Sequence, residues 1–174
     1  MRAFLVVLAL GAGLEQAPAQ PPKFAGSWKL DAAQSRVVDA VGLAGLIGAG
    51  APPMLYITQP ANGTLIVESP INEGHVRIYH PGGKTTTPVG QGGTITMSTA
   101  WAGATLVSQG TSVSASGVSA AVKEIYSVSA DGNVLTIDVT SVAPDEKSST
   151  LKYVRITSVG PCESWPTPCK RTGG

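Results

Sequence analysis

The residues best suited to chemistry lie in the stretch AAVKEIYSV, where a glutamate and a tyrosine stand two positions apart. Successive side chains of an extended strand point to opposite faces, so Val122, Glu124, Tyr126 and Val128 would share one face. If that face points into the protein, Glu124 is a buried carboxylate. It would then need a positive partner, because an unpaired buried charge is very costly.

Three arrangements of Glu124 are compatible with the sequence. An inward Glu124 paired with Arg77 or Arg155 could orient the polar head of a ligand. The same pair could instead only fix the register of the strands. In the third arrangement the alternate residues, beginning at Lys123, face inward and Glu124 is solvated.

Other catalytic and metal-binding patterns are weak. Hydrolysis by paired carboxylates would require two acids in one cleft, and Asp138 lies on the strand predicted to pair with that of Glu124. The alternation of a strand places His75 and His80 on opposite faces, which does not suit a metal pair. No G-x-S-x-G motif of a serine hydrolase occurs. We therefore predict no catalytic residue, no metal site and no cofactor.

From residue 54 onward the sequence is typical of β-strands joined by turns. Short runs of Val, Ile, Thr and Tyr are separated by Gly, Asn and Pro, and Asn62-Gly63 and Asp131-Gly132 are hairpin dipeptides. These runs predict an all-β, antiparallel domain of about eight or nine locally connected strands. Residues 37–48, VVDAVGLAGLIG, predict a short helix or an apolar loop after the first strand.

Closing such a sheet into an up-and-down barrel would remove its exposed edges and leave an interior for side chains or one small ligand. A barrel needs a plug at one end, and Trp28 of FAGSWKLD could supply it. Gly26 beside it would let another backbone come close. Arg155, on the last predicted strand, could then lie flat against the indole ring in a cation–π contact.

Five motifs occur in order over about residues 24 to 157: AGSWKLDAAQS, HVRIYHPGGK, WAGATL, EIYSVSADGNVLTI and LKYVRI. Together they resemble the lipocalin-like proteins of the calycin superfamily, in particular small secreted bacterial proteins of unknown function. The glycine-rich segment at 42–50 and the cysteine-containing tail depart from that pattern. The resemblance implies a lipocalin-like barrel and a binding role.

The two ends of the chain suggest export. Residues 1–19 combine a basic start, a short apolar run and an A-x-A ending at Ala19, as in a cleaved signal peptide. We expect residues 20–158 to form the barrel domain of a secreted or periplasmic protein without a transmembrane segment. In the tail, residues 159–174, Cys162 and Cys169 would form a disulfide in an oxidising compartment.

The predicted function is the non-enzymatic binding of a small, largely apolar ligand inside the barrel. The net charge of +1, without a basic cluster, argues against a nucleic-acid partner. The alternatives are an envelope-associated structural or interaction module with a filled barrel, or a hydrolase that uses barrel-lining carboxylates. The residues expected to contact the ligand are Tyr56, Arg77, Trp101, Glu124 and Tyr126, and those with structural roles are Gly26, Trp28 and Arg155.

Overall fold

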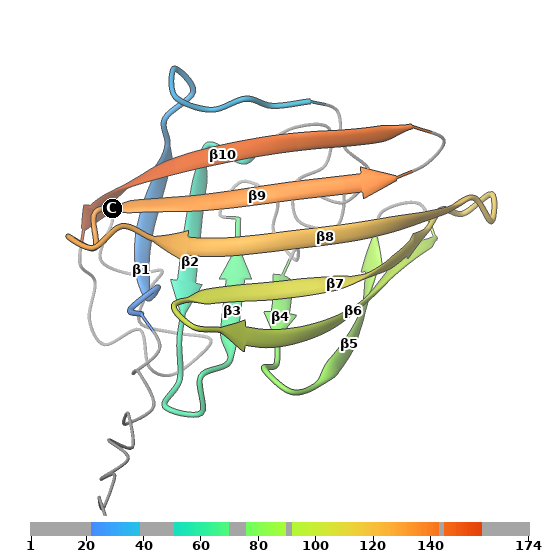
Figure 1. Ribbon diagram of the computed structural model, residues 1–174, viewed down its shortest axis with the longest axis horizontal. Coiled ribbons are helices and arrows are strands. Elements are labelled where there is room, and N and C mark those ends of the chain that lie inside the picture. The colour runs from blue at the N-terminus through green and yellow to red at the C-terminus, as the bar shows by residue number, and fades with distance from the viewer. Residues whose placement is uncertain (1–21, 39–50, 70–75, 90–91, 143–144, 158–174) are drawn as a thin grey trace, which may run out of the picture.

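The computed structural model describes residues 22–38, 51–69, 76–89, 92–142 and 145–157, which contain ten β-strands and no helix (Figure 1). The strands are β1 (Gly26–Leu30), β2 (Met54–Thr58), β3 (Leu65–Glu68), β4 (Val76–Tyr79), β5 (Lys84–Val89), β6 (Gly93–Ala102), β7 (Thr105–Val113), β8 (Ser119–Val128), β9 (Val134–Val142) and β10 (Glu146–Thr157).

All ten strands belong to one antiparallel sheet in the order β4-β3-β2-β1-β10-β9-β8-β7-β6-β5. The first and last strands of the chain, β1 and β10, therefore pair with each other. The two edges, β4 and β5, follow one another in sequence. A hydrogen bond from Thr85 Oγ1 to the Ile78 carbonyl oxygen (3.1 Å) connects these two edges, and a bridge pairs Pro81, between β4 and β5, with Thr99 on β6. The result is a nearly closed up-and-down barrel.

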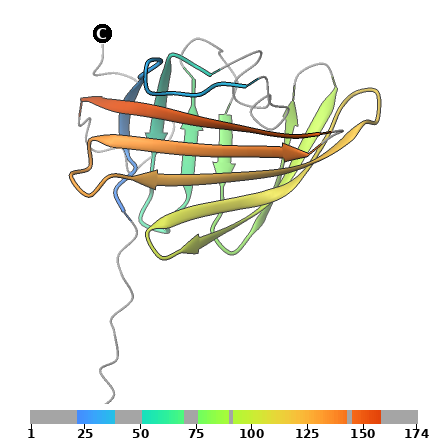
Figure 2. The same cartoon turned by 45° about the horizontal axis from the view of Figure 1, so that its top comes forward.

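The short strands β1 to β4 cross the long strands β6 to β10 on the opposite wall of the barrel (Figures 1 and 2). Gly110 on β7 lies close to the backbone of the neighbouring strand β6. A Cβ atom at this position would lie 1.8 Å from the carbonyl oxygen of Thr96 on β6. Only glycine fits there, because the obstructing atom belongs to the main chain.

The all-β, antiparallel barrel predicted from the sequence is confirmed, but the number of strands is ten rather than eight or nine. The added strand is β5, whose sequence KTTTPV contains Pro88. Proline cannot donate a ladder hydrogen bond and therefore argues against a central strand, whereas an edge strand such as β5 tolerates it.

Three predictions fall on parts of the chain outside the described residues. They are the signal peptide at 1–19, the short helix or apolar loop at 37–48 beyond Val38, and the disulfide between Cys162 and Cys169. The described part of the chain contains no helix long and apolar enough to cross a membrane.

The inner face of the barrel carries two apolar clusters. The smaller one consists of Ile95, Met97 and Val122. The larger one surrounds Trp28 and comprises Phe24, Trp28, Leu55, Ile57, Leu65, Val67, Tyr79, Leu106, Tyr126, Leu135, Ile137, Val139, Leu151 and Tyr153. Along β8, Glu124 lies between a member of the smaller cluster and a member of the larger one.

Candidate ligand-binding site

The inner face of β8 holds a glutamate that is 0% exposed, Glu124. Its neighbours across the ladder are Ser108 on β7 and Val139 on β9, and both are buried as well. Lys123, by contrast, is exposed. Glu124 thus points into the barrel, which excludes the arrangement with a solvated Glu124 and agrees with the two in which Glu124 faces inward.

The positive partner of Glu124 is Arg77, which reaches it from β4. Arg77 Nη2 lies 3.1 Å from Glu124 Oε2, and both side chains are buried. The hydroxyl of Tyr79, two residues along β4, donates to the same carboxylate oxygen at 2.7 Å. Because that proton is engaged, Tyr126 must be the donor in the 2.6 Å contact between the two tyrosine hydroxyls. We call Arg77, Tyr79, Glu124 and Tyr126 the charged layer.

Burial and mutual charge determine the protonation of the charged layer. Burial lowers the pKa of Arg77, but the opposing effect of the Glu124 charge, with the two tyrosines, leaves that pKa above its ordinary value. Burial raises the pKa of Tyr79 and that of Tyr126, so both hydroxyls stay neutral and can donate. The ion pair of Arg77 and Glu124 supplies one positive and one negative charge, so the net charge of the charged layer is zero.

Two atoms of the ion pair lack a hydrogen-bond partner among the described residues. They are Glu124 Oε1, an acceptor, and Arg77 Nη1, a donor, and both are buried. Most buried polar groups in proteins are hydrogen-bonded, and leaving one unpaired costs about 1–3 kcal/mol, or more when it is charged. The charged layer therefore presents one open acceptor and one open donor inside the barrel.

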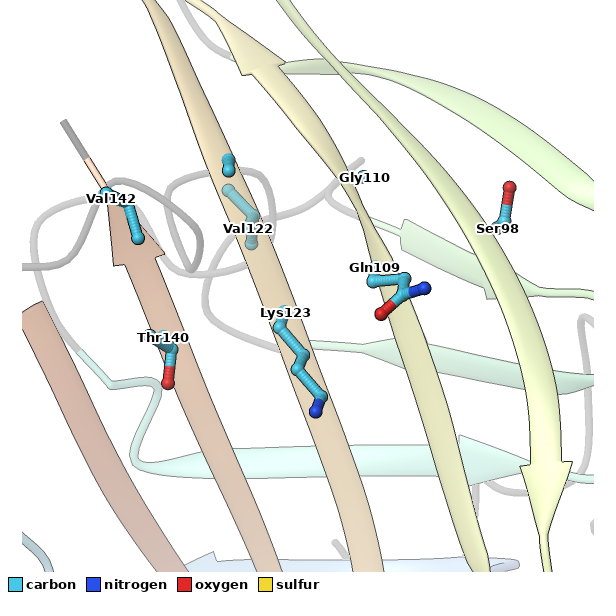
Figure 3. A pocket seen from close by; sticks show the side chains of 8 residues that line it. Ser98, Gln109, Gly110, Val122, Lys123, Thr140 and Val142 are labelled. Atoms are coloured by element: carbon cyan, nitrogen blue, oxygen red, sulfur yellow. The ribbon is translucent and has the colours of Figure 1, made fainter. Parts of the chain in front are cut away.

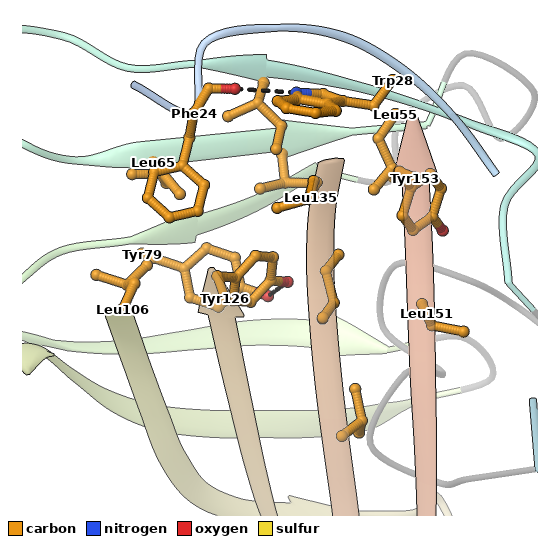
Figure 4. Close-up of a cluster of buried hydrophobic side chains, with 14 residues drawn as sticks. Phe24, Trp28, Leu55, Leu65, Tyr79, Leu106, Tyr126, Leu135, Leu151 and Tyr153 are labelled. Carbon is orange, nitrogen blue, oxygen red and sulfur yellow. Dashed lines mark hydrogen bonds between the residues drawn. The ribbon is translucent and has the colours of Figure 1, made fainter. Parts of the chain in front are cut away.

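The larger apolar cluster closes the other part of the interior around Trp28, which is 0% exposed. Figure 4 shows the indole ring near Phe24 and Leu55, with its Nε1 donating to the Phe24 carbonyl oxygen at 2.9 Å. Phe24 also contacts Trp101, their ring centroids being 5.8 Å apart. Tyr79 and Tyr126 are members of this cluster (Figure 4), so the charged layer and the cluster share two residues.

Arg155 lies against Trp28 and not beside Glu124. Its guanidinium carbon is 4.1 Å from the centre of the indole ring. Each of its three nitrogens donates to a backbone carbonyl: Nε to Gly132 (2.8 Å), Nη1 to Ala25 (2.6 Å) and Nη2 to Lys23 (3.0 Å). Arg155 thereby ties the end of β10 to the β8–β9 turn and to the segment before β1.

The residues expected to contact a ligand lie in three different places in the structure. Arg77, Glu124 and Tyr126 meet in the charged layer, and Trp101 is partly buried against the larger cluster. Tyr56 is the exception. It packs with Ala25 and Met54 in a separate cluster, while its neighbours on β2 belong to the larger one. Tyr56 therefore lies apart from the other residues expected to contact the ligand.

The paired carboxylates of the hydrolase alternative are not brought together. Asp138 pairs with Ile125 on β8, one position out of phase with Glu124, and accepts a hydrogen bond from Thr150 at 2.6 Å. The two acids therefore point to opposite faces of the sheet. His80 is exposed at the end of β4, with Nδ1 3.1 Å from Thr64 Oγ1, and His75 lies outside the described residues.

Sequence reasoning missed Tyr79, which is central to the charged layer. The signal was present, because Tyr79 is two positions from Arg77 and must share its face in an extended strand. The fully buried Thr99–Ser108 pair, with hydroxyls 2.9 Å apart, was missed as well. The alternation of each strand held the signal, because Thr99 shares a face with Met97 on β6 and Ser108 shares a face with Leu106 on β7.

A shallow groove of about 580 Å³ lies on the outer wall and is separate from the charged layer (Figure 3). Its side chains come mainly from outward positions of β6 to β9, where Lys123 and Gln109 are exposed. The complete lining is Ser98, Gln109, Gly110, Ala121, Val122, Lys123, Thr140 and Val142. It contains no group prepared for catalysis and no buried charge.

Comparison with solved structures identifies the barrel type. The chain is similar to fatty-acid-binding protein 1 of Echinococcus granulosus, with a TM-score of 0.54 and 16% sequence identity over 77% of this chain and 98% of that one. It is also similar to a luciferase domain of the dinoflagellate Lingulodinium polyedrum, with a TM-score of 0.49 and 18% identity over 90% of this chain and 48% of that one. No family model and no curated protein sequence matches the chain. At this level of identity the likeness concerns the fold alone, an antiparallel β-barrel similar to that of the fatty-acid-binding protein.

Proposed function

We propose that this protein binds a small, largely apolar molecule inside its barrel and catalyses no reaction on it. The observation that carries the proposal is the inner face of a nearly closed antiparallel barrel, which combines apolar walls with the buried ion pair of Arg77 and Glu124. Barrels with about this number of strands enclose a space suited to one small ligand. The fold shared with a fatty-acid-binding protein supports the same proposal.

The inward residues suggest how the ligand would be held. Its apolar part would contact the larger cluster, where Tyr126 and Trp101 offer the bulkiest surfaces near the charged layer. Its polar end would meet Arg77 and Glu124, because an apolar site usually orients its ligand through a few placed polar groups. Trp28 and Arg155 would only support the walls, since their polar atoms already have backbone partners.

Native mass spectrometry of the protein purified from its own source tests this function. We expect a co-purifying small molecule, released on denaturation, and saturable binding when the emptied protein is titrated with medium-chain lipids. The measured mass also tests a second part of the proposal, the export of the protein. Removal of residues 1–19, expected from their signal-peptide pattern, would shorten the chain to begin at Gln20.

The rival function is an envelope-associated structural or interaction module with a filled barrel. The dense aromatic packing around Trp28 favours it, because Phe24, Trp28 and Tyr153 are all 0% exposed. Under this alternative, repeated purifications would yield no bound molecule and no lipid would bind to the folded protein. That result would overturn the carrier function.

A further inference from the structure

We propose that the ligand has a neutral polar head group that both donates and accepts a hydrogen bond, such as a primary amide or an alcohol. Glu124 Oε1 would accept from this head group and Arg77 Nη1 would donate to it. The inference rests on the proposed function and specifies its ligand class. It comes from the two buried atoms of the ion pair that have no partner among the described residues.

The charge of the site selects against an ionised ligand. Arg77 is already neutralised by Glu124 at 3.1 Å, and both side chains are buried. A carboxylate head would meet the open acceptor Glu124 Oε1, and a like charge at close range in a buried site is strongly unfavourable. An ammonium head would meet Arg77 in the same way. A neutral head avoids both repulsions.

The hydrogen-bonding capacity of the site selects against purely apolar molecules and against acceptors alone. A hydrocarbon would leave both open atoms desolvated and unpaired, and a ketone could pair only with Arg77 Nη1. Sites that contain buried polar groups discriminate against ligands that leave those groups unpaired. An amide or an alcohol satisfies both atoms.

The surrounding residues are engaged elsewhere. Tyr79 donates to Glu124 Oε2, and Tyr126 donates to Tyr79. Ser108, across the ladder from Glu124, has its hydroxyl 2.9 Å from that of Thr99. None of these contacts involves Glu124 Oε1, which therefore has no hydrogen-bond partner among the described residues.

Isothermal titration calorimetry of the folded full chain with three probes of equal shape and chain length tests the inference. The probes are decanamide, 2-undecanone, which replaces the amide nitrogen by a methyl group, and decanoate, which is ionised at about pH 7. We expect decanamide to bind about tenfold tighter than either of the others, the effect of one unsatisfied buried group. Hydrophobic transfer alone would favour the ketone, so the expected order is opposite to that of simple partitioning.

Two single variants connect the preference to the ion pair. Glu124→Gln removes the negative charge and leaves Arg77 as an uncompensated cation, so decanoate should become the preferred probe, with a gain of about tenfold or more. Lys123→Gln is the matched control, because Lys123 is exposed on the opposite face of the same strand. It should leave the order of the three probes unchanged.

The possible results separate the inference from the proposed function. Equal binding of the three probes, or tightest binding of decanoate to the unaltered protein, would overturn the neutral head group and leave apolar binding intact. If the protein binds none of the three probes and no other lipid, both the neutral head group and the proposed function are overturned. If Glu124→Gln does not fold, the unaltered protein with the three probes still decides. The double variant Arg77→Met/Glu124→Leu should then bind the ketone at least as well as the amide.

Discussion

Arg155 and Arg77 both lie against aromatic rings in the walls of this barrel, but their guanidinium groups have different hydrogen-bond partners. Arg155 is partly buried over Trp28, and its three nitrogens donate to three backbone carbonyls. Arg77 is 2% exposed and lies 5.2 Å from the centre of the Tyr79 ring. It shares its charge with Glu124 through Nη2, while Nη1 has no partner among the described residues.

The difference indicates what each region is for. The side chain of Arg155 donates only to backbone carbonyls, and these belong to the segments that it holds together. This is what we expect of a residue with a structural role. Arg77 instead forms a charge pair that the surrounding protein satisfies only in part. Native proteins rarely leave such groups unpaired without a reason, and a polar ligand would supply one. We therefore regard the Trp28 region as structural and the charged layer as the binding region.

The largest effect is expected from Arg77→Met. This change leaves Glu124 as an uncompensated buried charge and should lower the free energy of unfolding by about 3–5 kcal/mol. The double variant Arg77→Met/Glu124→Leu should recover most of that loss, because an apolar pair of similar volume fits a buried site well. Denaturant unfolding of both single variants and of the double variant gives the coupling free energy.

Strict additivity of the Arg77 and Glu124 changes would contradict the ion pair. A loss below about 1 kcal/mol for Arg77→Met would contradict its deep burial, since that is the range of exposed pairs. The rescue is the informative part, because it distinguishes a costly unpaired charge from a simple cavity. If the loss came from a cavity, replacing the second side chain would enlarge that cavity and lower the free energy of unfolding further.

The parts of the fold predicted from the sequence are those that depend on local chemistry. Asn62-Gly63 and Asp131-Gly132 mark turns, and Gly63 and Gly132 have φ values of 77° and 75° in the structure. The strand β5, which was not predicted, contains Pro88, and proline has no backbone N–H to donate. An edge strand such as β5 tolerates this loss because only one of its sides is paired. A single sequence does not reveal which strand lies at the edge, because that depends on how β1 meets β10.

The candidate site was predicted less completely, for a related reason. Arg77 and Glu124 are separated by 47 positions and meet only because the sheet curls until β4 faces β8. Strand alternation could place each on a face but could not choose Arg77 over Arg155. On β2, MLYIT, the face of Leu55 and Ile57 belongs to the larger cluster, whereas Tyr56 lies on the alternate face.

A smaller effect is expected from Arg155→Met. The change removes hydrogen bonds to three carbonyls and the contact over Trp28, and should cost about 1–3 kcal/mol. Unlike Arg77→Met, it should not be rescued by Glu124→Leu, because the two residues do not touch. Lys152→Met, at an outward position of β10, is the matched control and should change stability by less than about 0.5 kcal/mol. Rescue of Arg155→Met by Glu124→Leu would show that the two arginines act together.

The smallest change in the free energy of unfolding is expected at alkaline pH. Tyrosines lie in both regions, so their ionisation can be used to compare the charged layer with the Trp28 region. Burial raises the pKa of Tyr79 and of Tyr126 in the charged layer, and that of Tyr153 near Trp28. Since the folded pKa exceeds the unfolded value of about 10, the stabilisation is complete below about pH 10 and is lost as the pH rises further. At about pH 10.5 each tyrosine should lower the free energy of unfolding by less than about 1 kcal/mol.

Replacing individual tyrosines assigns this pH dependence to a region. Tyr126→Phe should reduce the slope of unfolding free energy against pH by up to about 1.4 kcal/mol per pH unit, and Tyr153→Phe should do the same for the Trp28 region. Because the charged layer holds two such tyrosines, Tyr79→Phe/Tyr126→Phe should remove about twice the slope that Tyr153→Phe removes. If tyrosinate absorbance appears in the folded protein near pH 10 and is lost in Tyr79→Phe/Tyr126→Phe, the hydroxyls of the charged layer are in contact with water. That result would contradict an enclosed charged layer.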